Sequence, residues 1–161
     1  MTEEKDRFAR AVWEQRGALY RAALAILSSP ADAEDAVSAA VEAAWKHLPG
    51  LRNPDALPAY LLRCTVNSAR AALRRRKRET PVEDMEAGGP SREAETPVWM
   101  YVGQLKEKYR LPLTLRYGEG MREEEIARVL RVPRGTVSSR LSRGLRLLRE
   151  QLEKEETGRD K

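Results

Sequence analysis

Serine and arginine side chains recur at helical spacing between residues 134 and 146. On a helix that turns about 100° per residue, one side of this stretch carries hydroxyl and guanidinium groups, on Ser139, Ser142, Arg143 and Arg146. The other side carries apolar residues, which are Val137, Leu141, Leu145, Leu148 and Leu152. Such a helix can bury one face while the other contacts phosphates and base edges. The pattern therefore predicts recognition of DNA in the major groove.

The residues in front of this helix complete a helix-turn-helix pattern. Three acids, Glu123–Glu125, favour the N-terminal turn of a preceding helix, and the small residue Ala127 permits close approach of the next one. Residues 131–133, Arg-Val-Pro, predict the turn. The polar face of the second helix, taken alone, could also be the solvated side of a surface helix. The preceding helix and turn favour DNA binding instead. The predicted DNA contacts are Arg134, Thr136, Ser138, Ser139, Arg140, Ser142, Arg143 and Arg146.

Arg143 lies near the centre of the predicted polar face, with the apolar residues opposite. A bidentate contact with a guanine and a contact with a phosphate are both compatible with a guanidinium at this place. A solvated side chain is the third alternative. The sequence leaves the three open, because the helix register is clear but the docking angle is not.

A second concentration of charge ends a long predicted helix. No breaker interrupts the chain between Ala59 and Arg78, and the last five residues, 74–78, are all arginine or lysine. Arginines in such a run suit contact with nucleic-acid phosphates whatever the base sequence.

Two further helices precede this one. Apolar residues recur at helical spacing from Arg7 until Ser28-Ser29-Pro30 interrupts the pattern. Ser29 can cap a second helix with Pro30 at its first position, and this helix is expected to end before Pro49. Its packing side is predicted to hold Ala33, Ala36, Val37, Ala40, Val41, Ala44 and Leu48. Its outer side is predicted to hold Asp35, Ser38, Glu42 and Lys46.

Residues 79–97 separate these helices from the second half of the chain. They combine three prolines and Gly88-Gly89 with six acidic side chains and one basic side chain, and they contain almost nothing large and apolar. Such a segment cannot support a packed core, so it is predicted to be a flexible linker. The flanking segments are basic, with 14 basic and 9 acidic side chains in residues 1–78 and 15 and 10 in residues 98–161.

The predicted fold is all-α, since no segment shows a convincing strand pattern. Beyond the linker, residues 98–109 and 111–119 are expected to form short helices before the helix-turn-helix. The organisation is therefore a first small helical domain over residues 1–78, the linker over 79–97, and a second helical domain over 98–161.

Several other classes of function find little support. The chain has one histidine, His47, and one cysteine, Cys64, and it lacks a glycine-rich phosphate loop and a nucleophile motif. We therefore expect no enzymatic activity, small-molecule substrate, metal or cofactor. Cys64 is predicted to be a buried thiol, and Trp13 and Trp45 are expected to pack in the core. No segment is apolar enough to span a membrane and the first residues are too charged for a signal peptide, which predicts a cytoplasmic protein.

Two parts of the chain resemble the extracytoplasmic-function sigma factors of the sigma-70 family. Three stretches resemble region four of that family: LPLTLRY at 111–117, EEIA at 124–127 and GTVSSRLSR at 135–143. Other residues resemble region two: DAEDAV at 32–37, Ala44-Trp45, LPAYLLR at 57–63 and Asn67. The two matches occur in the order of the family, which implies a bacterial factor that directs RNA polymerase core to promoters.

The resemblance also implies partners for particular residues. The helix around residues 32–46 would bind the clamp helices of RNA polymerase through Asp32, Asp35, Ser38, Ala39 and Glu42. The helix that ends in the basic run would bind the melted downstream promoter element through Asn67, Arg70, Arg74, Arg75 and Arg76. The helix-turn-helix would bind the upstream promoter element. An anti-sigma factor is a further implied partner.

A few residues depart from the family pattern. Ser38 stands where glutamine is common, Val41-Glu42 where a Phe-Leu-like pair is common, and Ser138 where lysine or arginine is common. A stand-alone helix-turn-helix regulator without polymerase binding is therefore the alternative function. Arg131 replaces a frequent glycine in the turn, and we expect it to adopt a left-handed conformation at a cost of roughly 1 kcal/mol.

Overall fold

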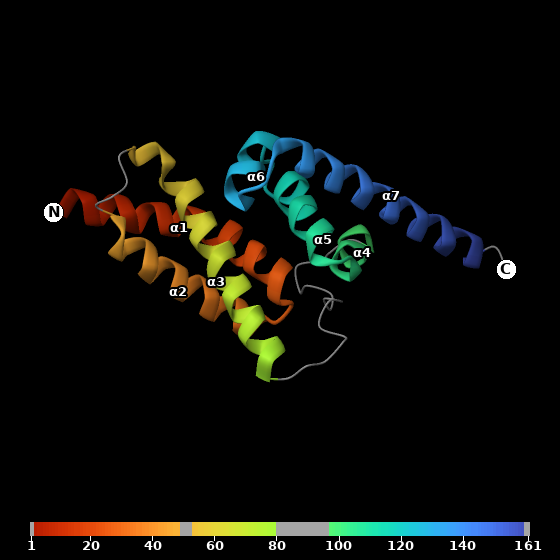
Figure 1. The fold of residues 1–161 in the computed structure, drawn as a ribbon, viewed down its shortest axis with the longest axis horizontal. Helices are drawn as coiled ribbons and strands as arrows, with labels where there is room; N and C mark the ends of the chain where they lie inside the picture. Colours follow the sequence, from red (N-terminus) through yellow and green to blue (C-terminus); the bar gives the residue numbers. More distant parts are fainter. Residues whose placement is uncertain (1, 49–52, 80–96, 160–161) are drawn as a thin grey trace. The chain divides into compact units, whose positions relative to one another are not determined.

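The computed structural model describes residues 2–48, 53–79 and 97–159, and every regular element in these ranges is helical (Figure 1). The chain divides into two compact units, the first formed by α1 to α3 and the second by α4 to α7. The prediction of two helical bodies is confirmed. The linker was predicted over residues 79–97, and residues 80–96 of it lie outside the described ranges, so its flexibility and the exact domain limits stay predictions. Its first and last residues are helical, because α3 ends at Glu79 and α4 begins at Pro97.

The first unit consists of α1 (Thr2–Leu27), α2 (Pro30–Lys46), the short 3₁₀ turn η2 (Pro54–Ala56) and α3 (Leu57–Glu79). The predicted cap of α2 is present, since the Asp32 amide donates to the Ser29 hydroxyl over 3.3 Å and Pro30 is the first helical residue. All three long helices pack on one another around Leu19, Ile26, Leu61 and Val66.

The inner face of α2 is built from small side chains. Its fully buried residues are Ala33, Ala36, Ala40 and Ala44. Val37 and Val41, which were also predicted to face the core, are only half-buried. The only side chains that α2 buries in this core are therefore alanine methyl groups. The position of α2 depends on close packing at these alanines.

The second unit contains α4 (Pro97–Gln104), α5 (Glu107–Leu113), the π-helical turn η4 (Thr114–Gly118), α6 (Glu123–Leu130) and α7 (Arg134–Arg159). The sequence predicted one helix over 98–109, but the chain breaks between α4 and α5 at Leu105 and Lys106. The guanidinium of Arg110, which is 3% exposed, donates to the Leu105 carbonyl over 2.6 Å. This contact satisfies a carbonyl at the break, and no short-range pattern in the sequence indicates it.

The buried side of α7 differs from the predicted one. Val137, Leu141 and Leu148 are buried, but Leu145 is 42% exposed and Gly144 is buried in its place. A Cβ atom on Gly144 would lie 2.9 Å from Cδ1 of Leu113 and 3.5 Å from Cβ of Tyr109, so α5 approaches α7 closely at this glycine. The face that packs is therefore rotated away from Leu145, and Leu145 lies at its edge.

Candidate functional site

The helix-turn-helix forms as the sequence predicted, and its turn contains a strained residue. Arg131 ends α6 in the left-handed region, with φ 57° and ψ 46°. The amide of Val132 donates to the Ala127 carbonyl over 3.1 Å, which satisfies one of the last carbonyls of α6. The expectation of a left-handed Arg131 is confirmed. The turn tolerates its cost because the helices on both sides are packed, with Ile126 and Val137 fully buried.

The start of α6 is held by a local contact. Glu125 accepts a hydrogen bond from the Arg122 amide over 3.1 Å and a second from Arg122 Nε over 3.0 Å. The backbone hydrogen bond and then the side-chain hydrogen bond lower the pKa of Glu125. The carboxylate is thus charged where the N-terminal end of α6 favours negative charge.

The residues predicted to contact DNA are not equally available on α7. Arg134, Ser139, Ser142, Arg143 and Arg146 are exposed. Thr136, Ser138 and Arg140 are half-buried. An exposed row of polar and basic side chains therefore runs along the first half of α7, as predicted from the sequence, and its contact with DNA stays a prediction.

Two of these residues contact α6. The Ser138 hydroxyl donates to Glu123 Oε1 over 3.1 Å. The Arg134 guanidinium pairs with Glu124 at 3.4 Å and with Glu123 at 3.8 Å. The acids predicted to favour the start of α6 thus also join α6 to the start of α7, and they offset the positive charge of Arg134. This second role was not predicted from the sequence, because it depends on the angle between the helices.

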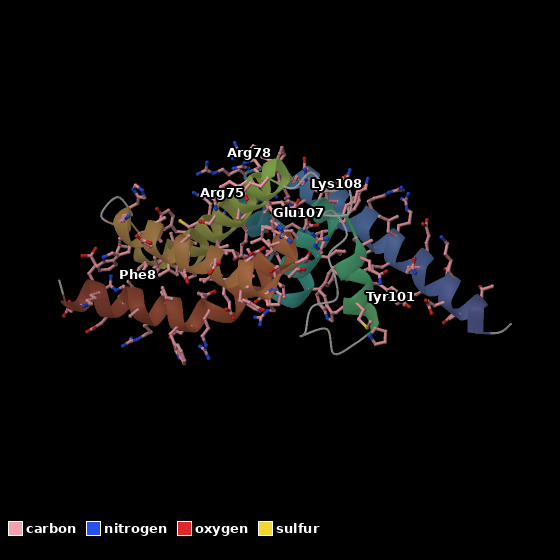
Figure 2. The ribbon with its side chains drawn as sticks, turned by 90° about the horizontal axis from the view of Figure 1, so that it is seen from below. Phe8, Arg75, Arg78, Tyr101, Glu107 and Lys108 are labelled. Carbon is pink, nitrogen blue, oxygen red and sulfur yellow. The ribbon has the colours of Figure 1, made fainter. Side chains whose placement is uncertain are left out.

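Two residues near Arg143 were also missed. Lys108 and Tyr109 lie in the first turn of α5, and the Lys108 ammonium is 5.1 Å from the centre of the Tyr109 ring. Figure 2 labels Lys108 and its neighbour Glu107. Burial raises the pKa of Tyr109, but hydrogen bonds and charges from Lys108 and then Arg143 lower it by more, so the net shift is downward. No pattern within α5 alone points to α7, because Gly144 brings the two helices together.

The residues of α3 that were predicted to contact DNA also differ in their exposure. Asn67, Arg74 and Arg75 are exposed, whereas Arg70 and Arg76 are half-buried. Figure 2 shows Arg75 and Arg78 at this end of α3, with their side chains projecting from the ribbon. The exposed arginines are placed to contact phosphates, and their binding to melted DNA stays a prediction.

Arg76 joins the ends of three helices. Its Nη1 donates to the Leu27 carbonyl at the end of α1 over 3.0 Å and lies 3.2 Å from Asp32 Oδ2 in the first turn of α2. Between them, Ser28 adopts a left-handed conformation with φ 60°. The structure thus gives Arg76 and Asp32 a contact with each other, although they were predicted to contact DNA and polymerase respectively.

Replacing Arg76 with alanine is expected to lower the free energy of unfolding of the first unit by about 1–3 kcal/mol. A hydrogen bond from a charged donor contributes about 1.5–3 kcal/mol, and a partly exposed ion pair adds about 0–1 kcal/mol. Urea unfolding followed by circular dichroism measures the change. Arg78→Ala is the matched control, because Arg78 is exposed in the same last turn. Equal loss in the two variants would show that Arg76 does not hold the helix ends.

The predicted polymerase-binding residues lie on the outer side of α2. Asp35, Ser38, Ala39 and Glu42 are exposed, and Asp32 is half-buried. Glu42 pairs with Lys46 at 3.3 Å, but both side chains are well exposed and the pair adds little stability. A groove of about 300 Å³ lies along the contact between α2 and α3, and its walls include Asp35 and Ala39 on one side and Arg75 on the other. The two predicted binding faces of the first unit thus meet along one groove.

The tryptophans and the cysteine differ from expectation. Trp13 is 65% exposed, with the Arg16 guanidinium 3.7 Å from its ring centre, so its prediction as a core residue is wrong. Trp45 is 43% exposed and contacts the ring of Phe8, so it packs only in part. Cys64 is half-buried, and its burial raises the pKa of the thiol more than the Tyr60 hydrogen bond and the Arg63 charge lower it. The thiol is therefore protonated, and poorly nucleophilic, at neutral pH.

The described part of the chain lacks clustered metal-ligating side chains and a helix that could cross a membrane. Residues 2–48, 53–79 and 97–159 contain no group of three or more metal-ligating side chains. Their helices include none that combines the length and apolar character needed to cross a bilayer.

Each helical unit matches a different family model. A family model for Sigma-70 region 2 matches residues 13–79, and one for Sigma-70, region 4 matches residues 96–148. The chain is 32% identical over 152 residues to the RNA polymerase sigma-E factor of Streptomyces avermitilis, covering 91% of this chain and 85% of that protein. It is 28% identical over 142 residues to the RNA polymerase sigma factor SigV of Bacillus subtilis, covering 85% and 86%.

Solved structures share the fold. One is the sigma factor RpoE in complex with the anti-sigma factor NepR from Bartonella quintana, with a TM-score of 0.75, 24% identity, and coverage of 91% of this chain and 96% of that one. Another is CnrH in complex with the cytosolic domain of CnrY, with a TM-score of 0.66, 25% identity, and coverage of 91% and 87%.

Proposed function

Because this chain belongs to the sigma-70 family and is an RNA polymerase sigma factor of the extracytoplasmic-function group, we propose that its two helical units divide promoter use between them. The first unit would bind the clamp helices of the polymerase core and the melted downstream element. The second would bind the upstream element as a duplex. The observation that carries this proposal is the order of the matches, with region 2 on α1 to α3 and region 4 on α4 to α7.

The proposed site residues are exposed members of the predicted sets, without Arg134, whose charge Glu123 and Glu124 offset. On α2 they are Asp35, Ser38, Ala39 and Glu42 for the polymerase, and on α3 they are Asn67, Arg74 and Arg75 for single-stranded DNA. On α7 the proposed contacts with duplex DNA are Ser139, Ser142, Arg143 and Arg146. Acidic and basic faces on neighbouring helices of one unit suit a protein partner and a polyanion at the same time.

Run-off transcription tests the proposed function directly. Purified core polymerase is combined with this protein on a promoter library, and enriched transcripts identify the promoter. We expect transcripts that depend on the added protein. Core polymerase that initiates equally with and without it would contradict the proposal. Retention of the protein on core polymerase separates a sigma factor from the alternative, a stand-alone helix-turn-helix regulator.

Charge reversal at Asp35 is expected to weaken binding to core polymerase at least tenfold. Asp35 is exposed on the outer side of α2, so an arginine there reverses the charge that α2 would present to the polymerase without disturbing the core. Equilibrium binding to core polymerase measures the loss, and circular dichroism checks that helicity is unchanged. Glu14→Arg makes the same charge change at an exposed position of α1 and should bind as the wild type does. Unchanged affinity of Asp35→Arg would remove α2 from the interface.

Two further properties belong to this proposal. The similar structures of RpoE and CnrH contain NepR and the cytosolic domain of CnrY, so we expect an anti-sigma factor to restrain this chain as well. We also propose that the protein acts in the cytoplasm, because promoter-dependent transcription takes place where the polymerase and the chromosome meet.

A further inference from the structure

The basic end of α3 (residues 74–78) lies beyond the part of the helix that packs in the core. The last fully buried side chain of α3 is Ala69. Residues 70–79, which the structure describes throughout, include no fully buried side chain, and Arg76 is the only half-buried residue of the basic end. Core packing therefore does little to fix where the basic end lies.

Arg76 connects the basic end to two acceptors on other helices. Its Nη1 donates to the Leu27 carbonyl over 3.0 Å and lies 3.2 Å from Asp32 Oδ2. Leu27 is the last residue of α1, where carbonyls lack a partner within the helix and the helix dipole is negative. Ser28 then adopts a left-handed conformation, and α2 begins two residues later. One guanidinium from the last turn of α3 thus satisfies a carbonyl of α1 and a carboxylate of α2.

These contacts make Arg76 less available to a phosphate than its neighbours. A DNA strand that bound Arg76 would have to compete with both acceptors, and it would leave the Leu27 carbonyl and the Asp32 carboxylate without their cation. Arg75 is exposed instead, and it lines the same groove between α2 and α3 as Arg76 and Asp32. A shift of the pair therefore moves an arginine that is open to a ligand.

We propose that Arg76 and Asp32 are positioning residues, which hold the basic end of α3 against the junction of α1 and α2 so that Arg74 and Arg75 meet the single strand. Neither member of the pair binds DNA or polymerase itself. This inference rests on the proposed function of the first unit as a domain that binds melted DNA. It assigns to one internal contact two residues whose sequence positions suggested two separate interfaces.

Amide hydrogen exchange in the free full chain tests the positioning without DNA. Exchange over residues 70–79 should be about two- to fivefold faster in Asp32→Asn, which loses a partly exposed ion pair. It should be faster still in Arg76→Ala, which also loses the hydrogen bond to Leu27. Glu34→Gln is the control, because it makes the same charge change at an exposed position near the start of α2 and should leave exchange unchanged.

DNA binding by the full chain assembled with core polymerase tests the consequence for the site. The probes are the promoter found by run-off transcription, mismatched over the melted element, and an unrelated mismatched duplex, each at several salt concentrations with core polymerase alone as background. Arg75→Ala should lower the affinity and also reduce the salt slope, by about 0.7 for one phosphate of a single strand. Arg76→Ala should lower the affinity about five- to tenfold on both probes with an unchanged slope, because the basic end is in place for a smaller fraction of the time.

The direction of the Asp32 effect separates positioning from simple electrostatics. Removal of an acid close to a DNA-binding surface raises the affinity for DNA or leaves it unchanged, and Glu34→Gln is expected to behave in this way. Asp32→Asn should instead lower the affinity about two- to fivefold, because Arg76 loses its carboxylate. Asp32→Asn should add nothing to the loss caused by Arg76→Ala, since the pair is then already broken.

Three results would overturn the positioning role. One is a salt slope that falls in Arg76→Ala as it does in Arg75→Ala, since Arg76 would then contact a phosphate. Another is weaker retention of Asp32→Asn on core polymerase with Glu34→Gln unaffected, since Asp32 would then contact the polymerase. The third is unchanged exchange over residues 70–79 in both variants of the pair. Faster exchange in both, with no binding of mismatched DNA by the wild-type assembly beyond that of core polymerase alone, would support the internal contact and contradict the proposed function.

Discussion

Gly144→Val is expected to destabilise the second unit by about 3 kcal/mol, at the upper end of the usual cost of overpacking a core. A Cβ at this position would lie 2.9 Å from Leu113 Cδ1 and 3.3 Å from Leu113 Cγ. Leu113 is 1% exposed and cannot swing into solvent, so α7 itself has to move away from α5. The two added methyl groups of valine deepen the clash. The polar face of α7 then loses its position relative to the rest of the unit.

We expect this variant to bind the promoter duplex at least tenfold more weakly and still to bind core polymerase through the first unit. Denaturant unfolding measures the stability, and amide hydrogen exchange over residues 97–159 localises the loss. Gly158→Val is the matched control on the same helix, because a Cβ at Gly158 meets no atom within 4 Å. Wild-type stability and promoter affinity in Gly144→Val would show that α5 and α7 do not depend on this close approach.

Ala40→Leu is the corresponding change in the first unit. Ala40 is 1% exposed on the alanine face of α2, and a leucine there adds three carbon atoms to a filled core. Overpacking of this kind costs about 1–3 kcal/mol, and occasionally more. Since α2 contacts both α1 and α3, it relieves the clash by moving outward, which displaces its outer face. Binding to core polymerase should therefore fall together with the free energy of unfolding.

Ala31→Leu supplies the control, because Ala31 is exposed in the first turn of the same helix and its larger side chain can extend into solvent. Both variants are compared in urea unfolding and in retention on core polymerase. If Ala40→Leu retains wild-type stability, the alanine face is loosely packed and the geometry of α2 is not set by it. If stability falls while polymerase binding is unchanged, the outer face of α2 does not form the interface.

The sequence by itself determined the elements that depend on short-range chemistry. The break at Ser29-Pro30, the length of α3 and the left-handed Arg131 each follow from residues a few positions apart, through capping, the absence of a breaker and the length of a turn. The exposed polar row of α7 follows from helical periodicity, which also operates over a few residues. Resemblance to regions two and four supplied the function, because those motifs are themselves local.

Only the tertiary structure decided which charged side chains pair with a group in another helix and which remain free to bind a partner. Arg76 is separated by 49 residues from its acceptor at Leu27, and Arg134 pairs with Glu123 and Glu124 of α6 although nothing within α7 alone indicates these partners. The tertiary structure also decided that Gly144 is buried on α7, whereas Leu145, which was predicted to be buried, is exposed. A rotation of tens of degrees about a helix axis leaves the periodic pattern intact and changes every neighbour. That rotation is set by how whole side chains fill the core between helices, which no window of a few residues contains.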